Sequence, residues 1–201
     1  MEKLFFCDLE TTGTNPEENG IHQIGGLVEI RGELLDEFSL NVRPFKEDKI
    51  DEKALKISGV TSEQLFSYPE PRAIYGDLIG RFQTHVDRFS RHDKFFFVGF
   101  NCFFDYSFLR RFFLKNGDSY FGSWIFWPII DVAVLAMQFL GGRRKAMSNF
   151  RLETVAESLG VEVEGEAHDA LHDVRTTHEI YKKIIQRPGC SSAGQSVTFG
   201  T

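Results

Sequence analysis

The fold of this chain can be predicted outward from one segment, Leu4-Phe5-Phe6-Cys7-Asp8-Leu9-Glu10-Thr11-Thr12-Gly13. A short apolar run that ends in turn-forming residues predicts a buried strand of a layered α/β domain. Side chains two residues apart on a strand lie on the same side of the sheet, so Asp8 and Glu10 would point the same way. Two such carboxylates repel each other unless a cation lies between them, and a divalent metal is the usual solution. Taken alone, the pair favours a metal site and a solvated strand end about equally.

A second buried strand is predicted at Phe95-Phe96-Phe97-Val98, which is again a continuous apolar run. Between the two runs, the β-rich segments Ile21–Ile30 and Glu33–Val42 are joined by a short turn, which predicts a hairpin. A helix is expected from about Glu70 to Phe89. Its apolar face consists of Ile74, Leu78, Phe82, Val86 and Phe89. A strand, a long helix and a second strand form a crossover, so the two buried runs are expected to be parallel neighbours.

The composition of the chain limits the classes of protein to which it can belong. Its 201 residues are 42% hydrophobic and 14% aromatic, which excludes a disordered chain and suits one domain. Its apolar runs are too short to span a bilayer, so no membrane partner is expected. Cys7, Cys102 and Cys190 are odd in number and lack metal-ligand spacing, which favours the reducing cytoplasm. The net charge of −6 argues against a protein held on nucleic acid by bulk charge, but bound cations could supply positive charge locally.

Further candidate ligands follow the second buried strand and precede the last predicted helix. Asp105 lies just past the strand, and His168 and Asp173 lie five residues apart where the final helix begins. The carboxyl ends of parallel neighbours share one edge of a sheet, where ligands bind in open α/β folds. Four carboxylates with one histidine beside them suit two Mg²⁺ or Mn²⁺ ions, because oxygen ligands favour hard cations.

Three motifs in this order resemble those of a known family. The segments Asp8-Leu9-Glu10-Thr11-Thr12-Gly13, Asn101-x-x-x-Asp105 and His168-x-x-x-x-Asp173 are similar to the exonuclease motifs of the DnaQ-like DEDDh 3′–5′ exonucleases. The resemblance covers about residues 4 to 185. It implies an RNase H-like α/β fold, with a central five-stranded mixed sheet flanked by helices. It also implies an exonuclease domain over residues 1–186, while residues 187–201 carry no core-forming pattern and are expected to be a disordered tail.

The resemblance also implies a role for each motif residue. Asp8 would bridge two metal ions, Glu10 and Asp173 would complete the ion that holds the attacking water, and Asp105 would serve the other ion. His168 would take the proton from that water, which suits a group whose pKa lies near working pH. The expected contacts to the terminal nucleotide are Leu9, Thr11, Thr12, Asn101 and Phe104. Asp131 is expected to cap a helix or to support the site from behind.

The leading hypothesis is a metal-dependent exonuclease that removes nucleoside 5′-monophosphates from the 3′ ends of single-stranded DNA, with proofreading as its setting. The alternative within enzymes is RNA 3′-end trimming or an oligoribonuclease-like activity, because readout of the 2′-hydroxyl depends on pocket shape. The alternative from another class is an inert nucleic-acid-binding or polymerase-bridging subunit.

Two further segments bear on partners. The basic residues Arg143, Arg144, Lys145 and Arg151 are expected to contact a nucleic-acid backbone. The segment Gln195-Ser196-Val197-Thr198-Phe199 resembles peptides that bind sliding clamps. A DNA polymerase and a sliding clamp are therefore the candidate protein partners.

Overall fold

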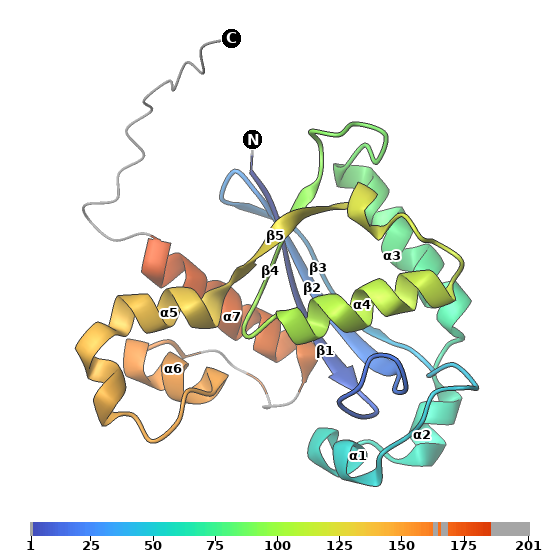
Figure 1. Cartoon of the computed structure of the whole chain (residues 1–201), viewed down its shortest axis with the longest axis horizontal. Coiled ribbons are helices and arrows are strands. Elements are labelled where there is room, and N and C mark those ends of the chain that lie inside the picture. The colour runs from blue at the N-terminus through green and yellow to red at the C-terminus, as the bar shows by residue number, and fades with distance from the viewer. Residues whose placement is uncertain (1, 163–164, 166–168, 186–201) are drawn as a thin grey trace.

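A five-stranded mixed sheet forms the centre of the molecule, as expected (Figure 1). The computed structural model describes residues 2–162, 165 and 169–185. The strands are β1 (Lys3–Thr11), β2 (Ile21–Ile30), β3 (Glu33–Asn41), β4 (Phe95–Gly99) and β5 (Ile125–Asp131). They lie in the order β3-β2-β1-β4-β5, with β1, β2 and β3 antiparallel and β4 and β5 parallel to β1. The predicted hairpin and the predicted parallel pair are both confirmed.

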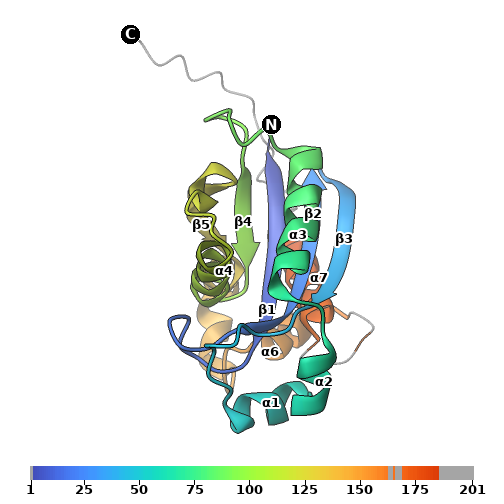
Figure 2. The same cartoon turned by 90° about the vertical axis from the view of Figure 1, so that its right-hand side faces the viewer.

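Helices cover both faces of the sheet. They are α1 (Glu52–Ser58), α2 (Ser62–Ser67), α3 (Pro71–His85), α4 (Phe103–Lys115), α5 (Val132–Leu140), α6 (Leu152–Leu159) and α7 (Ala170–Ile185). Short 3₁₀ helices are η1 (Phe121–Ser123) and η2 (Gly141–Ala146). Apolar side chains of α3 and α4 pack on one face of the sheet, and those of α5, α6 and α7 on the other. Figure 2 shows α3 in front of the sheet and α7 behind it.

The adjacent residues Phe5 and Phe6 explain why β1 reads as a continuous apolar run. Successive side chains on a strand point to opposite faces. Phe5 meets Phe82 of α3 with ring centroids 4.9 Å apart, and Phe6 meets Tyr181 of α7 at 5.3 Å. Both rings are fully buried, and each such burial stabilises the fold by about 1.5–3 kcal/mol. The first strand is therefore fixed between two helical layers.

The ends of several elements follow local sequence signals. Thr61 and Gln64 form the reciprocal hydrogen bonds of a capping box at the start of α2. The helix expected to reach Phe89 instead ends at His85, because Asp87 accepts a hydrogen bond from the amide of Phe89 and forms a turn. The Phe89 side chain is 91% exposed, so its expected place on the buried helical face is wrong. None of the helices in the described part of the chain has the length and hydropathy to cross a membrane.

Candidate active site

Three carboxylates meet at the carboxyl end of β1. One ligand oxygen from each of Asp8, Glu10 and Asp173 can be chosen so that all three lie within 4.8 Å of one another. The alternation of the strand aims Asp8 and Glu10 to one side, and the first turn of α7 brings Asp173 to them. Gly25 on β2 pairs with Asp8 and lets α7 approach, because a Cβ there would lie 2.3 Å from the Ala170 carbonyl oxygen.

The fourth carboxylate, Asp105, is tied to the first strand by a hydrogen bond. The backbone amide of Leu9 donates to Oδ1 of Asp105 over 3.1 Å, and the aspartate is buried in the first turn of α4. A negative charge is favoured there by the unpaired amides of a helix N-terminus. The parallel pairing of β1 with β4 puts the two strand ends side by side, and α4 begins just past β4. The predicted convergence of these acids is therefore a property of the fold.

Mutual repulsion and burial make this group of acids costly to keep ionised. Burial, followed by the charges of Asp105, Asp173 and Glu10, raises the pKa of Asp8 well above its ordinary value. Burial and the charges of Asp173 and Asp169 raise the pKa of Glu10 to about 7. Burial also raises the pKa of Asp105, although the hydrogen bond from Leu9 opposes that change. A divalent cation would remove this repulsion, so the donor set fits a hard metal ion.

A capping residue that the motif comparison did not single out holds the start of α7. Asp169 accepts hydrogen bonds from the amides of Leu171 and His172, both over 3.1 Å. Gln23 of β2 donates to the same carboxylate over 2.8 Å. An aspartate just before a helix is a capping signal that can be recognised in the sequence. Its contact with Gln23, 146 residues away in the chain, could not be predicted.

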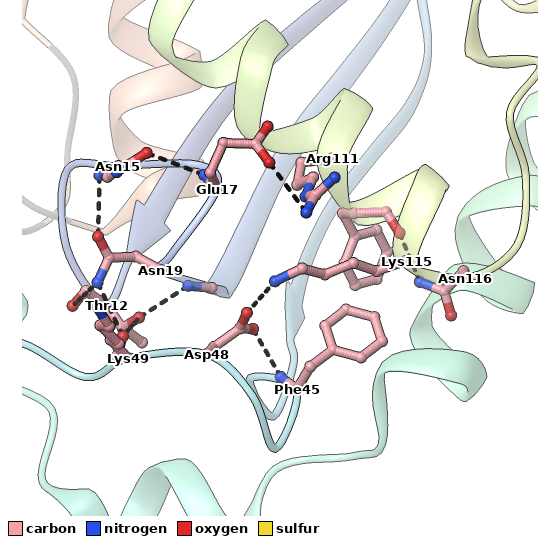
Figure 3. A network of polar contacts seen from close by, with 12 residues as sticks. Thr12, Asn15, Glu17, Asn19, Phe45, Asp48, Lys49, Arg111, Lys115 and Asn116 are labelled. Atoms are coloured by element: carbon pink, nitrogen blue, oxygen red, sulfur yellow. Dashed lines mark hydrogen bonds and ion pairs between the residues drawn. The ribbon is translucent and has the colours of Figure 1, made fainter.

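A network of polar contacts holds the loop that follows β1 (Figure 3). Thr12 is fully buried; its hydroxyl donates to the Lys49 carbonyl over 2.7 Å and accepts from the Gly20 amide over 2.9 Å. The Asn19 side chain accepts from the Asn15 amide over 2.9 Å and donates to the Lys49 carbonyl over 2.9 Å. These bonds position the turn directly after the carboxylate pair, and a contact of Thr12 with substrate stays a prediction.

The other residues expected to touch the terminal nucleotide lie in different surroundings. The side chains of Leu9 and Thr11 are buried, Phe104 is half-buried against Phe108 with ring centroids 4.7 Å apart, and Asn101 is exposed. Their substrate contacts stay predictions, as do the roles of the acids.

Asp131 caps α5 as expected. Its Oδ1 accepts a hydrogen bond from the Ala133 amide over 2.9 Å and another from the Asn101 amide over 3.0 Å. Asn101 has a positive φ of 55°, so this second bond holds the exposed residue in an uncommon backbone conformation. Asp131 therefore supports the β4–α4 turn as well as its own helix.

Two of the sequence-based predictions fall outside the described residues. His168, the expected proton acceptor, lies in the undescribed segment 166–168 just before Asp169. The segment 195–199, with its resemblance to clamp-binding peptides, lies in the undescribed range 186–201, as does the expected tail. The basic residues Arg143 and Arg144 are described and belong to η2.

The chain is similar in sequence to known proteins over most of its length. The chain is 30% identical over 179 residues to the 3′-5′ DNA exonuclease Cap18 of Escherichia coli, covering 88% of each chain. It is 27% identical over 181 residues to the PolC-type DNA polymerase III of Thermotoga maritima. That match covers 89% of this chain but only 12% of the polymerase.

The solved structures agree on the fold. Crystallised E. coli exonuclease I in complex with a dT13 oligonucleotide matches with a TM-score of 0.74 and 20% identity, covering 93% of this chain and 42% of that one. A family model described as an exonuclease of the RNase T type matches residues 5–181, which include every described acid of the site. The chain therefore belongs to the RNase T exonuclease family, within the DnaQ-like group that its motifs resemble.

Proposed function

We propose that this protein is a metal-dependent 3′–5′ exonuclease that hydrolyses the terminal phosphodiester bond of single-stranded DNA and releases nucleoside 5′-monophosphates. The observation that carries the proposal is the meeting of Asp8, Glu10 and Asp173 within 4.8 Å, with Asp105 held beside them by the Leu9 amide. Membership of an exonuclease family supports the reaction, and the similarity to a DNA exonuclease supports the substrate.

We infer that the four carboxylates hold two Mg²⁺ or Mn²⁺ ions. Bound divalent cations supply Lewis-acid chemistry, because they hold the attacking and leaving oxygens and offset the growing negative charge at phosphorus. Four acidic side chains are enough for two such ions, and oxygen donors favour these metals over softer ones. The raised pKa values of Asp8 and Glu10 support the inference, since repulsion among the acids disappears once cations are bound.

The chain itself positions the substrate and moves the proton in this proposal. His168, which lies five residues before Asp173 in the chain, accepts the proton of the attacking water. The water oxygen forms a bond to phosphorus, the bond to the 3′ oxygen of the neighbouring nucleotide breaks, and that oxygen takes up a proton. The turn at Thr11–Gly13, which follows Glu10 in the chain, and the exposed Asn101, four residues before Asp105, are the proposed contacts of the terminal nucleotide.

The decisive experiment compares Asp8→Ala and His168→Ala with the wild type on a single-stranded oligonucleotide in Mn²⁺. Both variants should lose digestion from the 3′ end by a factor of at least about 10². The Asp8 variant should also lose metal binding, measured by calorimetry, whereas the His168 variant should retain it. Undiminished digestion in both variants would exclude the proposed mechanism, and no digestion by the wild type would favour a protein that only binds nucleic acid.

The same assay separates DNA from RNA. Matched DNA and RNA oligonucleotides should be digested at different rates, with DNA faster; faster digestion of RNA would assign the chain to RNA 3′-end trimming.

A DNA polymerase is proposed as a protein partner because the chain is similar to a segment that makes up 12% of a PolC-type polymerase. Co-purification with a polymerase subunit would test that partner directly.

A further inference from the structure

A hollow of about 660 Å³ follows the outer face of α4, the helix that carries Asp105. We call it the α4 groove. Helical residues three and four apart share one face, and this face consists of Phe103, Tyr106, Ser107, Arg110, Arg111 and Leu114. The loop after β1 contributes Glu17, and the edge strand β5 contributes Trp127. Phe103 begins α4 two residues before Asp105, so the groove includes the helical turn that carries this acid.

Two exposed aromatic side chains mark the wall of the α4 groove. Phe103 is 62% exposed and Trp127 is 63% exposed. The Trp127 ring lies 5.5 Å from the ring of Tyr106, and Tyr106 lies 5.3 Å from the buried Phe121. Packing from below therefore holds the indole in place while it stays open to solvent. Ordered aromatic rings of this kind are surfaces on which nucleic-acid bases stack.

The α4 groove also contains a positively charged side chain, Arg110, that could pair with an anionic ligand. Arg111 pairs with Glu17 over 3.0 Å, and Asp118 pairs with Arg88 over 3.5 Å, so these charges are balanced. Arg110 is exposed and forms no ion pair with any residue in the described ranges. The helix rises about 10 Å between Phe103 and Arg110, so an aromatic ring and a positive charge follow one another away from the site. Such spacing complements a strand that presents bases and phosphates in turn.

We propose that the α4 groove binds the nucleotides upstream of the scissile bond in a single-stranded nucleic acid. This proposal rests on the proposed function, since it places the 3′ end at the acids. Upstream bases stack on Phe103 and Trp127, and one phosphate pairs with Arg110. The groove thus gives the protein a preference for long single strands over very short ones.

Tryptophan fluorescence tests the groove without any hydrolysis. The chain has two tryptophans, and Trp124 is fully buried, so a change on binding reports Trp127. Titration of the Asp8→Asn variant with dT15 in Mg²⁺ should change the emission saturably, and dT3 should change it little. The change should disappear in Asp8→Asn/Trp127→Phe. Arg110→Ala in the same background should flatten the slope of log affinity against log salt by about 0.7.

Digestion kinetics of the otherwise unchanged protein provide the second measurement. Trp127→Ala and Arg110→Ala should each raise KM for dT15, the former at least about fivefold, and should raise KM for dT3 by a smaller factor. Phe89→Ala is the matched control, because Phe89 is 91% exposed but lies between α3 and β4, at the other end of the strand from the acids. It should behave as the wild type.

The outcomes separate the groove from the catalytic proposal. If the wild type digests dT15 but the emission does not change, the groove proposal is wrong and the proposed nuclease activity stands. If the emission changes but the wild type digests nothing, the groove proposal stands and the proposed nuclease activity is wrong. If Arg143→Ala/Lys145→Ala raises KM for dT15 and Trp127→Ala does not, the strand leaves the site over η2 and the groove proposal is wrong. If neither dT15 nor dT3 changes the Trp127 emission, the groove does not bind a single strand and the proposal is wrong.

Discussion

The backbone amide of Leu9 donates a hydrogen bond to Oδ1 of Asp105 across 96 residues of sequence. This one contact joins the first strand, which carries Asp8 and Glu10, to the start of α4. Because the amide lies between the two acids of the strand, any shift of α4 relative to β1 would change the position of Asp105 relative to both of them. Geometry of the site and stability of the fold are therefore coupled at Asp105.

Asp105→Asn and Asp105→Ala should distinguish the contribution of Asp105 to stability from its contribution to activity. The asparagine oxygen can still accept from Leu9, so Asp105→Asn should be at least as stable as the wild type without metal. Asp105→Ala leaves the buried amide without its acceptor and should lose about 1–3 kcal/mol of unfolding free energy in urea. Both variants should lose metal-dependent digestion. Equal stability of the two would contradict the structural role assigned to the Leu9 bond.

Asp8→Asn should stabilise the protein when no metal is bound. The change removes a charge that Asp105, Asp173 and Glu10 repel, so in EDTA at pH 7.5 the unfolding free energy should rise by about 1 kcal/mol or more. Mn²⁺ should raise the melting temperature of the wild type, since it binds only the folded state, but that of the variant much less. Glu47→Gln, at an exposed acid outside the cluster, should show neither effect. A less stable Asp8→Asn protein in EDTA would mean that repulsion among the acids does not limit the stability of the metal-free protein.

His22 should make the fold sensitive to mild acid. Burial lowers the pKa of this imidazole to about 4 from 6.5, and its Nε2 lies 3.2 Å from the Ser58 hydroxyl. Between these two pH values only the unfolded chain takes up the proton, so the contribution of His22 to stability falls as the pH falls from 6.5 to 4. The loss should amount to up to about 3 kcal/mol.

Urea unfolding of the wild type and His22→Gln across this pH range would measure the effect. The comparison of the two proteins is essential, because the raised pKa values of Asp8 and Glu10 change stability in the opposite direction. The stability difference between wild type and variant should shift steadily below pH 6.5. A constant difference would show that His22 has the same pKa in the folded and the unfolded protein.

The ion pair of Lys115 and Asp48 should hold α4 to the loop before α1 (Figure 3). The Asp48 side chain is fully buried and also accepts from the Phe45 amide over 2.8 Å. Lys115→Met leaves that carboxylate without its cation and should cost about 3–5 kcal/mol. Lys115→Met/Asp48→Asn should recover most of the loss, because asparagine keeps the bond from Phe45.

An exposed pair supplies the matched control for this measurement. Lys49 and Glu18 are 3.1 Å apart, but their side chains are 69% and 50% exposed. Lys49→Met should therefore cost less than about 1 kcal/mol. A similar cost at both sites would mean that burial does not set the strength of the Lys115 pair.

Much of the candidate active site could be predicted because its sequence signals are local. The two-residue period of a strand dictates that Asp8 and Glu10 share a side, whatever the rest of the chain does. The order strand, helix, strand dictates a parallel neighbour, and this puts Asp105 at the same sheet edge. The capping box of Thr61 is likewise complete within four residues.

The contacts that hold the site together depend on tertiary structure alone. Gln23 reaches Asp169, and Lys115 reaches Asp48, only because packing brings segments together that are far apart in the chain. Phe89 fits the helical period but lies in solvent, since periodicity does not say where a helix stops. The α4 groove likewise combines residues of a helix, a loop and an edge strand. Backbone periodicity and connectivity are enough to predict which residues could hold a metal and on which strand ends they lie. How near the acids come to one another, and which surface leads away from them, depends on how the helices pack on the sheet, because this packing sets the distances between segments.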